Sequence, residues 1–241
     1  MKSLKSVIRQ GLWATAVVLT SASSWAATVS SSAFIDITSL TVTPQSGSAS
    51  LSFNPDYSYS LVETDINGSN DFLDGSDPVS LFSDNGSFTE ASAYADQEMV
   101  VSQTSVGDPS GWADALSIHE LEYTASGSGK VLVQVDYDLD LGIIDPAGSI
   151  VSAFAFAELL DEDSGNSDSI DIFSTGLPGD PSTAVGSLSI LLDVQDGQVG
   201  FLQLTALSDS FAERATVPLP ATFWLLAPGL GLVLRLGRRA N

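Results

Sequence analysis

The sequence predicts an all-β fold, a single antiparallel β-sandwich, from three observations. Apolar and polar residues alternate over most of the chain body, which is the period of a strand with one buried face. Apolar residues at helical spacing are nearly absent. Segments rich in Ser, Asp, Asn and Gly separate the alternating runs, as turns do. Many short strands without helical connections favour a sandwich, either jelly-roll-like or immunoglobulin-like.

The first half of the body contains only short pieces of this pattern. Alternating or apolar pieces lie at residues 40–43, 51–53, 57–61 and 79–82. The polar composition of residues 63–78 predicts a surface loop, and Asn85-Gly86 predicts a turn. Residues 91–101 fit a strand or a short helix, and the pattern does not decide between them.

The clearest strand is predicted at residues 130–141. Its valines, Tyr137, Leu139 and Leu141 point one way, while Gln134 and three aspartates (Asp136, Asp138 and Asp140) point the other way. Such a strand has one buried face and one solvent-exposed face, as in an antiparallel sandwich. In residues 150–160, alanines form one face and Phe154 and Phe156 the other. Both faces are apolar, so this strand is expected to lie centrally.

A hairpin is predicted near the end of the body. Residues 188–194 and 199–207 flank Asp196-Gly197, which is a strong two-residue turn signal. That turn would pair Val194 with Val199 and Leu192 with Phe201, apolar against apolar.

The two ends of the chain carry targeting patterns. Basic residues precede an apolar run at 12–19, and Ser24-Trp25-Ala26 follows, which predicts a signal peptide over residues 1–26. At the other end, residues 221–234 are uncharged and span about 21 Å as a short apolar helix, less than a bilayer core of about 30 Å. Arg235, Arg238 and Arg239 follow as a cytoplasmic stop.

Residues 217–241 resemble a known sorting signal. A rigid motif (Val217, Pro218, Leu219, Pro220 and Ala221), the apolar run and the arginine tail occur in the order of the PEP-CTERM signal, in its Val-Pro-Leu-Pro-Ala variant. Leu219 stands where the commoner form has Glu. The resemblance implies an exosortase that removes the anchor after the protein has been exported and signal peptidase has removed the signal peptide. It also implies an inner-membrane intermediate and a final place at the Gram-negative cell surface or in an extracellular polysaccharide matrix.

Between these ends, residues 27–216 are expected to form one acidic domain. Thirty acidic residues stand against two basic ones, Lys130 and Arg214, which gives a formal charge of −28. Such a surface repels nucleic acid and attracts cations. The chain has no cysteine, so disulfides and thiolate chemistry are excluded.

Familiar catalytic patterns are missing from the sequence. His119 is the only histidine, too few for a zinc site, and it is expected to be an ordinary strand residue. No nucleophile elbow and no phosphate-binding loop occurs. A carboxylate pair for glycoside hydrolysis is available, but thirty acidic residues make that uninformative.

Calcium is the metal that suits this chain, because it takes oxygen ligands. Two acidic segments are candidate calcium loops or else solvated connections. The candidate ligands are Asp65, Asn67, Ser69 and Asp71 in the first segment, and Asp161, Asp163 and Asp168 in the second.

Trp112 is the only tryptophan left after processing of both ends, and the sequence places it in a loop. It is a candidate sugar platform or else a hydrophobic plug under its own loop. We therefore expect an exported, non-enzymatic surface or matrix protein that contacts exopolysaccharide, with calcium as a bridge. The alternatives are a secreted carbohydrate-active enzyme or glycan-binding module, and a permanently anchored envelope protein.

Overall fold

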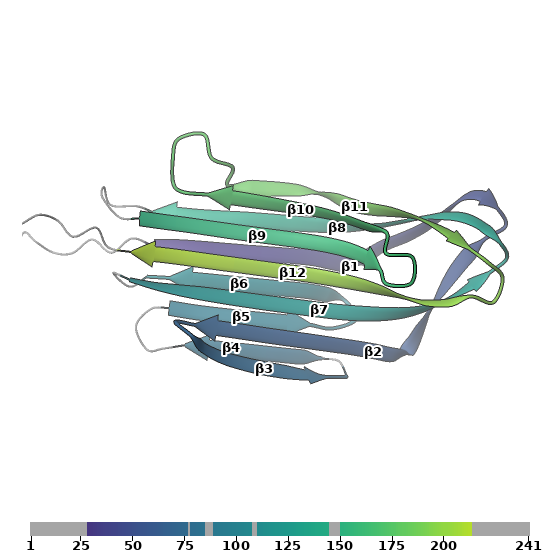
Figure 1. Ribbon diagram of the computed structural model, residues 1–241, viewed down its shortest axis with the longest axis horizontal. Helices are drawn as coiled ribbons and strands as arrows, with labels where there is room; N and C mark the ends of the chain where they lie inside the picture. The colour runs from purple at the N-terminus through teal and green to yellow at the C-terminus, as the bar shows by residue number, and fades with distance from the viewer. Residues whose placement is uncertain (1–27, 77, 85–88, 108–109, 145–149, 214–241) are drawn as a thin grey trace, which may run out of the picture.

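The computed structural model describes residues 28–213, except 77, 85–88, 108–109 and 145–149. Two six-stranded sheets pack face to face, and every strand pairing in them is antiparallel (Figure 1). The predicted all-β antiparallel sandwich is therefore confirmed. Sheet A has the order β11 (Thr183–Val194), β8 (Gly129–Ile144), β1 (Thr28–Gly47), β6 (Met99–Val106), β5 (Thr89–Ala95) and β4 (Val79–Asp84).

Sheet B has the order β10 (Ser167–Ser174), β9 (Ile150–Asp161), β12 (Val199–Glu213), β7 (Ser110–Ser126), β2 (Ser50–Ile66) and β3 (Ser69–Gly75). None of the described residues forms a helix, and the described part contains no helical segment of the length and apolarity needed to cross a bilayer. Residues 91–101, left open by the pattern, are the end of β5, a turn at Asp96 and the start of β6.

The strand predicted at residues 130–141 is confirmed as the middle of β8, with Val131, Val133 and Val135 buried and Asp136, Asp138 and Asp140 exposed. The strand predicted at residues 150–160 is β9, which pairs on both sides, with β10 and β12. Its alanines are buried and its phenylalanines lie on the outer face of sheet B.

The predicted hairpin at Asp196-Gly197 is wrong. β11 pairs with β8 in sheet A and β12 pairs with β7 and β9 in sheet B, so the turn crosses between the sheets. Leu192 therefore lies opposite Val131, and Phe201 lies opposite Glu122. The physical reason is a neighbouring turn that makes the same crossing from β7 to β8. Asp196 accepts a hydrogen bond from the Gly127 amide at 2.7 Å, and the Gly197 amide donates to the Ala125 carbonyl at 2.9 Å.

The predicted surface loop at residues 63–78 is also wrong. β2 continues to Ile66, the chain turns at Asn67-Gly68, and β3 returns along β2. Both turn residues have positive φ, 54° and 86°, as a tight hairpin turn requires. β3 is an edge strand whose side chains are almost all exposed. Because neither of its faces is buried, its sequence lacks the apolar alternation that predicts a strand.

The strands of β1 and β2 each contain a register shift. In β1 the shift lies between Asp36 and Thr41, and in β2 between Phe53 and Ser58. At the first shift, the Asp36 carboxylate accepts hydrogen bonds from the Thr38 amide and hydroxyl, and the Ser39 hydroxyl donates to the Asp36 carbonyl. Each shift changes which alternate residues face inward. Tyr59 and Leu61 consequently face outward, and Ser60 and Val62 face the core.

The core between the sheets consists mainly of alanine and valine, with buried hydroxyls among them. Some of these hydroxyls join the two sheets. Ser117 of β7 donates to the Val101 carbonyl of β6 and accepts from the Tyr94 amide of β5. Thr64 of β2 shares a hydrogen bond with Ser83 of β4, 2.7 Å away. The sandwich is therefore fastened by polar links as well as by apolar packing.

The described chain starts and ends at the same end of the sandwich, since β1 begins where β12 finishes (Figure 1). The predicted signal peptide (1–26), the motif Val217–Ala221, the apolar C-terminal helix, Arg235, Arg238 and Arg239, and the turn at Asn85-Gly86 all lie outside the described residues.

Candidate functional site

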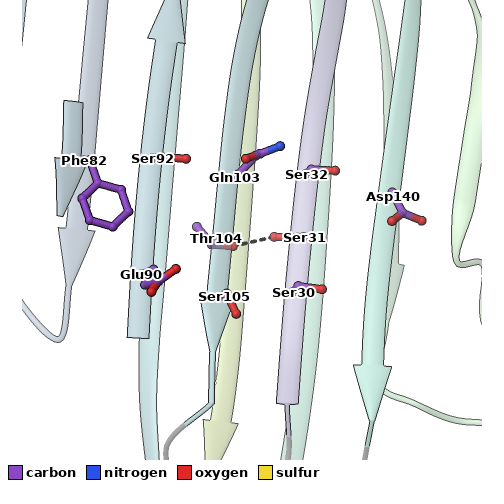
Figure 2. Close-up of a pocket in the computed structure, with 10 residues that line it drawn as sticks. All are labelled: Ser30, Ser31, Ser32, Phe82, Glu90, Ser92, Gln103, Thr104, Ser105 and Asp140. Atoms are coloured by element: carbon purple, nitrogen blue, oxygen red, sulfur yellow. Dashed lines mark hydrogen bonds between the residues drawn. The ribbon is translucent and has the colours of Figure 1, made fainter. Parts of the chain in front are cut away.

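A shallow hollow of about 300 Å³ lies on the outer face of sheet A, towards the end of the sandwich where the described chain starts and finishes. Five neighbouring strands contribute its side chains, as Figure 2 shows. We call it the sheet A groove. It is lined by Phe82 of β4, Glu90 and Ser92 of β5, Gln103 and Ser105 of β6, Ser30 and Ser32 of β1, and Asp140 of β8.

The strand register lines these residues up in two rows. In the first row, Phe82 lies opposite Ser92, Ser92 opposite Gln103, Gln103 opposite Ser32, and Ser32 opposite Asp140. In the second row, Glu90, Ser105, Ser30 and Gly142 lie opposite one another in turn. Neighbouring strands are about 4.8 Å apart, so the first row is about 19 Å long.

The depth of the groove follows from side-chain size. The serines on β5, β6 and β1 are half-buried and short, so they form a low floor. Phe82, Glu90, Gln103 and Asp140 are longer and exposed: Phe82 and Asp140 stand at the two ends of the first row, Glu90 begins the second row, and Gln103 stands in the middle of the first row between Ser92 and Ser32 (Figure 2). Gly142 continues the floor beside Ser30. It has no side chain, and a Cβ atom there would lie only 2.5 Å from the Ser30 hydroxyl.

The floor rests on a buried hydroxyl cluster that connects the two sheets. Ser31 points inward between Ser30 and Ser32 and donates to the Asp209 carbonyl of β12 at 2.8 Å. Its single hydrogen is then used, so it accepts from Thr104, 2.7 Å away, or from Ser210, 3.2 Å away. Thr104 and Ser210 are themselves 2.8 Å apart. These bonds hold β1 and β6 at a fixed height above sheet B.

The chemistry of the groove suits a neutral, hydroxyl-rich ligand. Serine hydroxyls and the Gln103 amide both donate and accept hydrogen bonds, and Glu90 and Asp140 accept them. Phe82 is 63% exposed and offers a flat apolar ring at one end. Lys130 is the only basic side chain among the described residues apart from His119, and no cation lines the groove. An anionic ligand would therefore be repelled.

A second hollow of similar size lies where the register shifts of β1 and β2 meet. Ile37, Leu40, Phe53, Asn54, Tyr57, Gln97 and Leu121 line it. It is more apolar than the sheet A groove, and the Tyr57 ring packs at a tilt against Phe201, with ring centroids 5.4 Å apart. Its hydrogen-bonding side chains are those of Asn54, Tyr57 and Gln97, fewer than line the sheet A groove.

Trp112 lies in β7 and not in a loop, and its side chain is half-buried on the outer face of sheet B. Its amide donates to the Asn67 side-chain oxygen at 3.0 Å, and its carbonyl accepts from the Asn67 amide at 3.2 Å. The candidate sugar platform therefore belongs to the opposite sheet from the groove.

The first predicted calcium segment is a hairpin. Thr64 and Asp71 lie opposite each other and Asp65 lies opposite Asn70, so Asp65 and Asp71 point to opposite faces of sheet B. Asp65 accepts from the Gly68 amide at 2.9 Å, and Asp71 accepts from the Ser83 hydroxyl at 2.9 Å. Ser69 lies at the start of β3, paired with Ile66. The structure does not bring these four candidate ligands together around one point.

The second predicted calcium segment surrounds Asp161, which is 1% exposed. One carboxylate oxygen of Asp161 accepts from the Tyr123 hydroxyl at 2.9 Å and the other from the Ser164 amide at 2.9 Å. Asp168 accepts from the Ser189 amide at 2.7 Å, whereas Asp163 is exposed in the turn. Within the described ranges, no group of three or more His, Cys, Asp or Glu side chains is arranged to hold a metal ion.

His119 is a buried strand residue of β7, and its Nδ1 lies 2.8 Å from the Ser60 hydroxyl. It faces the core and is remote in the fold from the sheet A groove, which faces outward. Nothing in its placement assigns it a catalytic role.

The groove residues were missed by the sequence reasoning. The only sequence feature that marks them is a set of serines at alternate positions, such as Ser30 and Ser32. Serines are common in exposed strands, so this feature does not indicate a binding site. The strand order 4-5-6-1-8 brings them together, and a sequence pattern does not contain that order. Comparison of the chain with known protein families, with curated proteins and with solved structures finds no match.

Proposed function

We propose that this protein is an exported, non-enzymatic β-sandwich protein that binds a neutral polysaccharide strand in the sheet A groove. The observation that carries the proposal is the pair of aligned polar rows across five strands, with Phe82 at one end. A sugar chain lying along the first row would place ring hydroxyls against Ser92, Gln103 and Ser32. The Phe82 ring would stack on the apolar face of a terminal sugar ring.

The placement of the groove carboxylates favours binding over hydrolysis. Glycosidases need two carboxyl groups about 5 to 9.5 Å apart. Glu90 and Asp140 are on β5 and β8, which are three strand spacings apart, about 14 Å. They also lie in different rows. These two residues are therefore better suited to accepting hydrogen bonds from separate sugar units than to acting on one bond.

Affinity electrophoresis of the full chain in gels containing neutral β-glucans, α-glucans or mannans tests this proposal. We expect at least one of these polymers to retard the protein. Phe82→Ala and Gln103→Ala should each weaken the binding about fivefold, which corresponds to about 1 kcal/mol per lost contact. Released reducing sugar should stay at the level of a blank.

The matched control is Phe173→Ala, which removes an exposed phenylalanine, 51% accessible, from the outer face of sheet B. Its affinity should equal that of the unchanged protein. An equal loss in Phe82→Ala and Phe173→Ala would contradict the groove as the binding site. The absence of retardation by every neutral polymer would contradict polysaccharide binding there.

The export part of the proposal is supported by the two ends of the sequence. Residues 1–26 fit a signal peptide, and residues 217–241 resemble the PEP-CTERM signal. We propose removal of both, with release to the cell surface or the matrix. Mass spectrometry of the protein from producing cells should find a C-terminus within or near Val217–Ala221. A mature chain that retains Arg238 and Arg239 would show permanent anchoring instead. Calcium as a bridge to the polysaccharide stays a prediction.

A further inference from the structure

The first row of the sheet A groove alternates between long and short side chains. The long ones stand on every second strand, β4, β6 and β8, and serines stand on β5 and β1 between them (Figure 2). In strand order, the row reads Phe82, Ser92, Gln103, Ser32 and Asp140. The alternation continues beyond the groove, because the shorter, exposed Thr183 of β11 lies opposite Asp140.

The alternation also has a constant interval. Every strand pair is in register where the row crosses it, so no side chain of the row is displaced along its strand. Neighbouring strands are about 4.8 Å apart, so a long side chain recurs about every 10 Å across the sheet. The groove therefore offers a ligand a regular series of raised positions, separated by gaps that carry a hydroxyl group.

The hydrogen-bonding groups of the row face outward, towards a ligand. In Figure 2 the marked hydrogen bond joins Ser31 and Thr104, which lie below the floor. No hydrogen bond joins Ser92, Gln103 and Ser32 to one another. Their two hydroxyl groups and one amide group each donate and accept hydrogen bonds. They therefore suit the hydroxyl groups of a sugar, which do the same.

The polar groups of this face extend across the strands rather than along them. On one side of the first row lies the second row, with Ser105 and Ser30. On its other side, Tyr94, Val101 and Phe34 lie opposite one another in turn and are half-buried. A long ligand that follows the hydrogen-bonding groups therefore runs across the strands, and it meets a long side chain about every 10 Å.

We infer that the ligand of the sheet A groove is an extended, β-1,4-linked chain of neutral hexose units. This inference rests on the proposed polysaccharide binding and adds the linkage to it. In a β-1,4-linked chain each sugar is turned over relative to the one before, so the chain is a flat ribbon that repeats every two sugars. One sugar advances the ribbon by about 5 Å, which is close to one strand spacing. The two-sugar repeat therefore matches the interval between the long side chains.

The match places equivalent sugars in equivalent surroundings. Every second sugar meets Phe82, Gln103 or Asp140, and each sugar between them lies over Ser92 or Ser32. Chains of the same sugars with β-1,3 or α-1,4 linkages are curved and coil. A curved chain follows the straight row over only one or two sugars and then leaves it. An anionic chain is repelled by the acidic surface.

Isothermal titration calorimetry of the full chain with tetrasaccharides tests the linkage. The β-1,4-linked probes are cellotetraose and mannotetraose, and the matched controls are laminaritetraose (β-1,3) and maltotetraose (α-1,4). Cellotetraose and both controls contain four glucose units and differ in linkage alone. We expect one of the β-1,4-linked probes to bind at least fivefold tighter than both controls.

Chain length gives a second measurement on the unchanged protein. The row from Phe82 to Asp140 covers four strand spacings, about 19 Å, which is room for about four sugars. The disaccharide of the preferred series should therefore bind at least tenfold more weakly than the tetrasaccharide. The hexasaccharide should gain less than threefold over the tetrasaccharide.

Ser32→Gln tests the alternation itself. It places a long side chain in a gap of the row, so it should weaken binding of the preferred tetrasaccharide at least tenfold. The matched control is Ser169→Gln, at an exposed position of β10 in the opposite sheet, which should change the affinity less than twofold. A near-ultraviolet circular dichroism spectrum confirms that both variants are folded.

The outcomes separate this inference from the proposed function. Equal or tighter binding of laminaritetraose or maltotetraose, weakened by Phe82→Ala, would overturn the β-1,4 linkage and leave binding in the groove intact. Equal affinities of Ser32→Gln and Ser169→Gln would overturn the match between the sugar repeat and the alternating row. Failure of every tetrasaccharide and every neutral polymer to bind would overturn the proposed function, and the linkage with it.

Discussion

Asp161 is a buried carboxylate that accepts hydrogen bonds from the Tyr123 hydroxyl and the Ser164 amide. The Tyr123 side chain of β7 crosses Gly200 of β12 to reach Asp161 on β9. A Cβ atom at Gly200 would overlap the Tyr123 phenol group, so the glycine leaves the ring its path. Burial, followed by the hydrogen bond to Asp161, raises the pKa of Tyr123. Three neighbouring strands are thus joined by one tyrosine.

Asp161→Ala is expected to lower the free energy of unfolding by about 2 to 3 kcal/mol. It would leave the buried Tyr123 hydroxyl and the Ser164 amide without their acceptor. Urea denaturation checks this value. Asp163→Ala, at an exposed turn position, should change stability by less than about 0.5 kcal/mol. If millimolar calcium stabilised the unchanged protein but not Asp161→Ala, the segment would be a metal site after all.

Asp114 gives a pH-dependent prediction. Its pKa of about 7 lies above the ordinary value for an unfolded aspartate, about 3.9. The native state therefore binds more protons between about pH 4 and 7, and this group lowers stability as pH rises through that window. Asp209, Asp65 and Glu63 face it, so the pH dependence belongs to the group of carboxylates.

Asp114→Asn should remove this loss. We expect it to raise the free energy of unfolding by about 1 kcal/mol at pH 8, a value reduced for partial solvent exposure, and by much less at pH 4.5. Urea denaturation at the two pH values measures the difference. Asp138→Asn, at an exposed site, should show no such contrast. A larger gain at pH 4.5 than at pH 8 would contradict the raised pKa.

At the scale of single elements, the sequence predicted the strands that have one apolar, buried face and one polar, exposed face. In β8 the valines are buried and the aspartates exposed, so the pattern and the structure agree. In β2 they disagree, because Ser60 and Thr64 face the core while Leu61 faces outward. There the inward hydroxyls have partners: Ser60 lies beside His119, and Thr64 beside Ser83. Alternation by itself does not reveal whether a row of serines and threonines faces the core or the solvent.

The polar link between β7 and sheet A gives a prediction for these elements. Ser117→Ala would remove the partner of the Val101 carbonyl and of the Tyr94 amide in the core. We expect a loss of about 1 to 3 kcal/mol in the free energy of unfolding. Ser80→Ala, at an exposed position of β4, is the matched control and should be nearly neutral. Thermal or urea unfolding that shows equal stability for both variants would contradict a structural role for this link.

At the scale of the whole molecule, the acidic charge was predictable and its arrangement was not. Composition gave the charge of −28 for residues 27–216, and the alternation of apolar and polar residues predicted the all-β class. The sheet A groove depends on strand order, and so does the alignment of Asp65, Asp114 and Asp209 across sheet B. β1 lies between β6 and β8, and β7 lies between β2 and β12. The turn at Asp196-Gly197 shows why that order was hidden, since a good hairpin signal joins strands of different sheets.

The uneven charge also predicts a salt effect on the whole fold. Repulsion among the carboxylates destabilises the compact state and is screened by salt. The melting temperature should rise between 10 mM and 500 mM sodium chloride at pH 8. The rise should shrink at pH 4, where many carboxylates are protonated. Differential scanning calorimetry measures both, and a melting temperature that falls with salt at pH 8 would contradict this.

The most direct test of the sheet A groove is an NMR titration of the isotope-labelled protein with a neutral oligosaccharide chosen from the polymer that retards it. We predict chemical-shift changes confined to the two rows, with the Gln103 side-chain amide and the amides of Ser32 and Ser92 among the largest. Changes centred on Trp112, or on the hollow lined by Phe53 and Tyr57, would contradict the groove as the binding site.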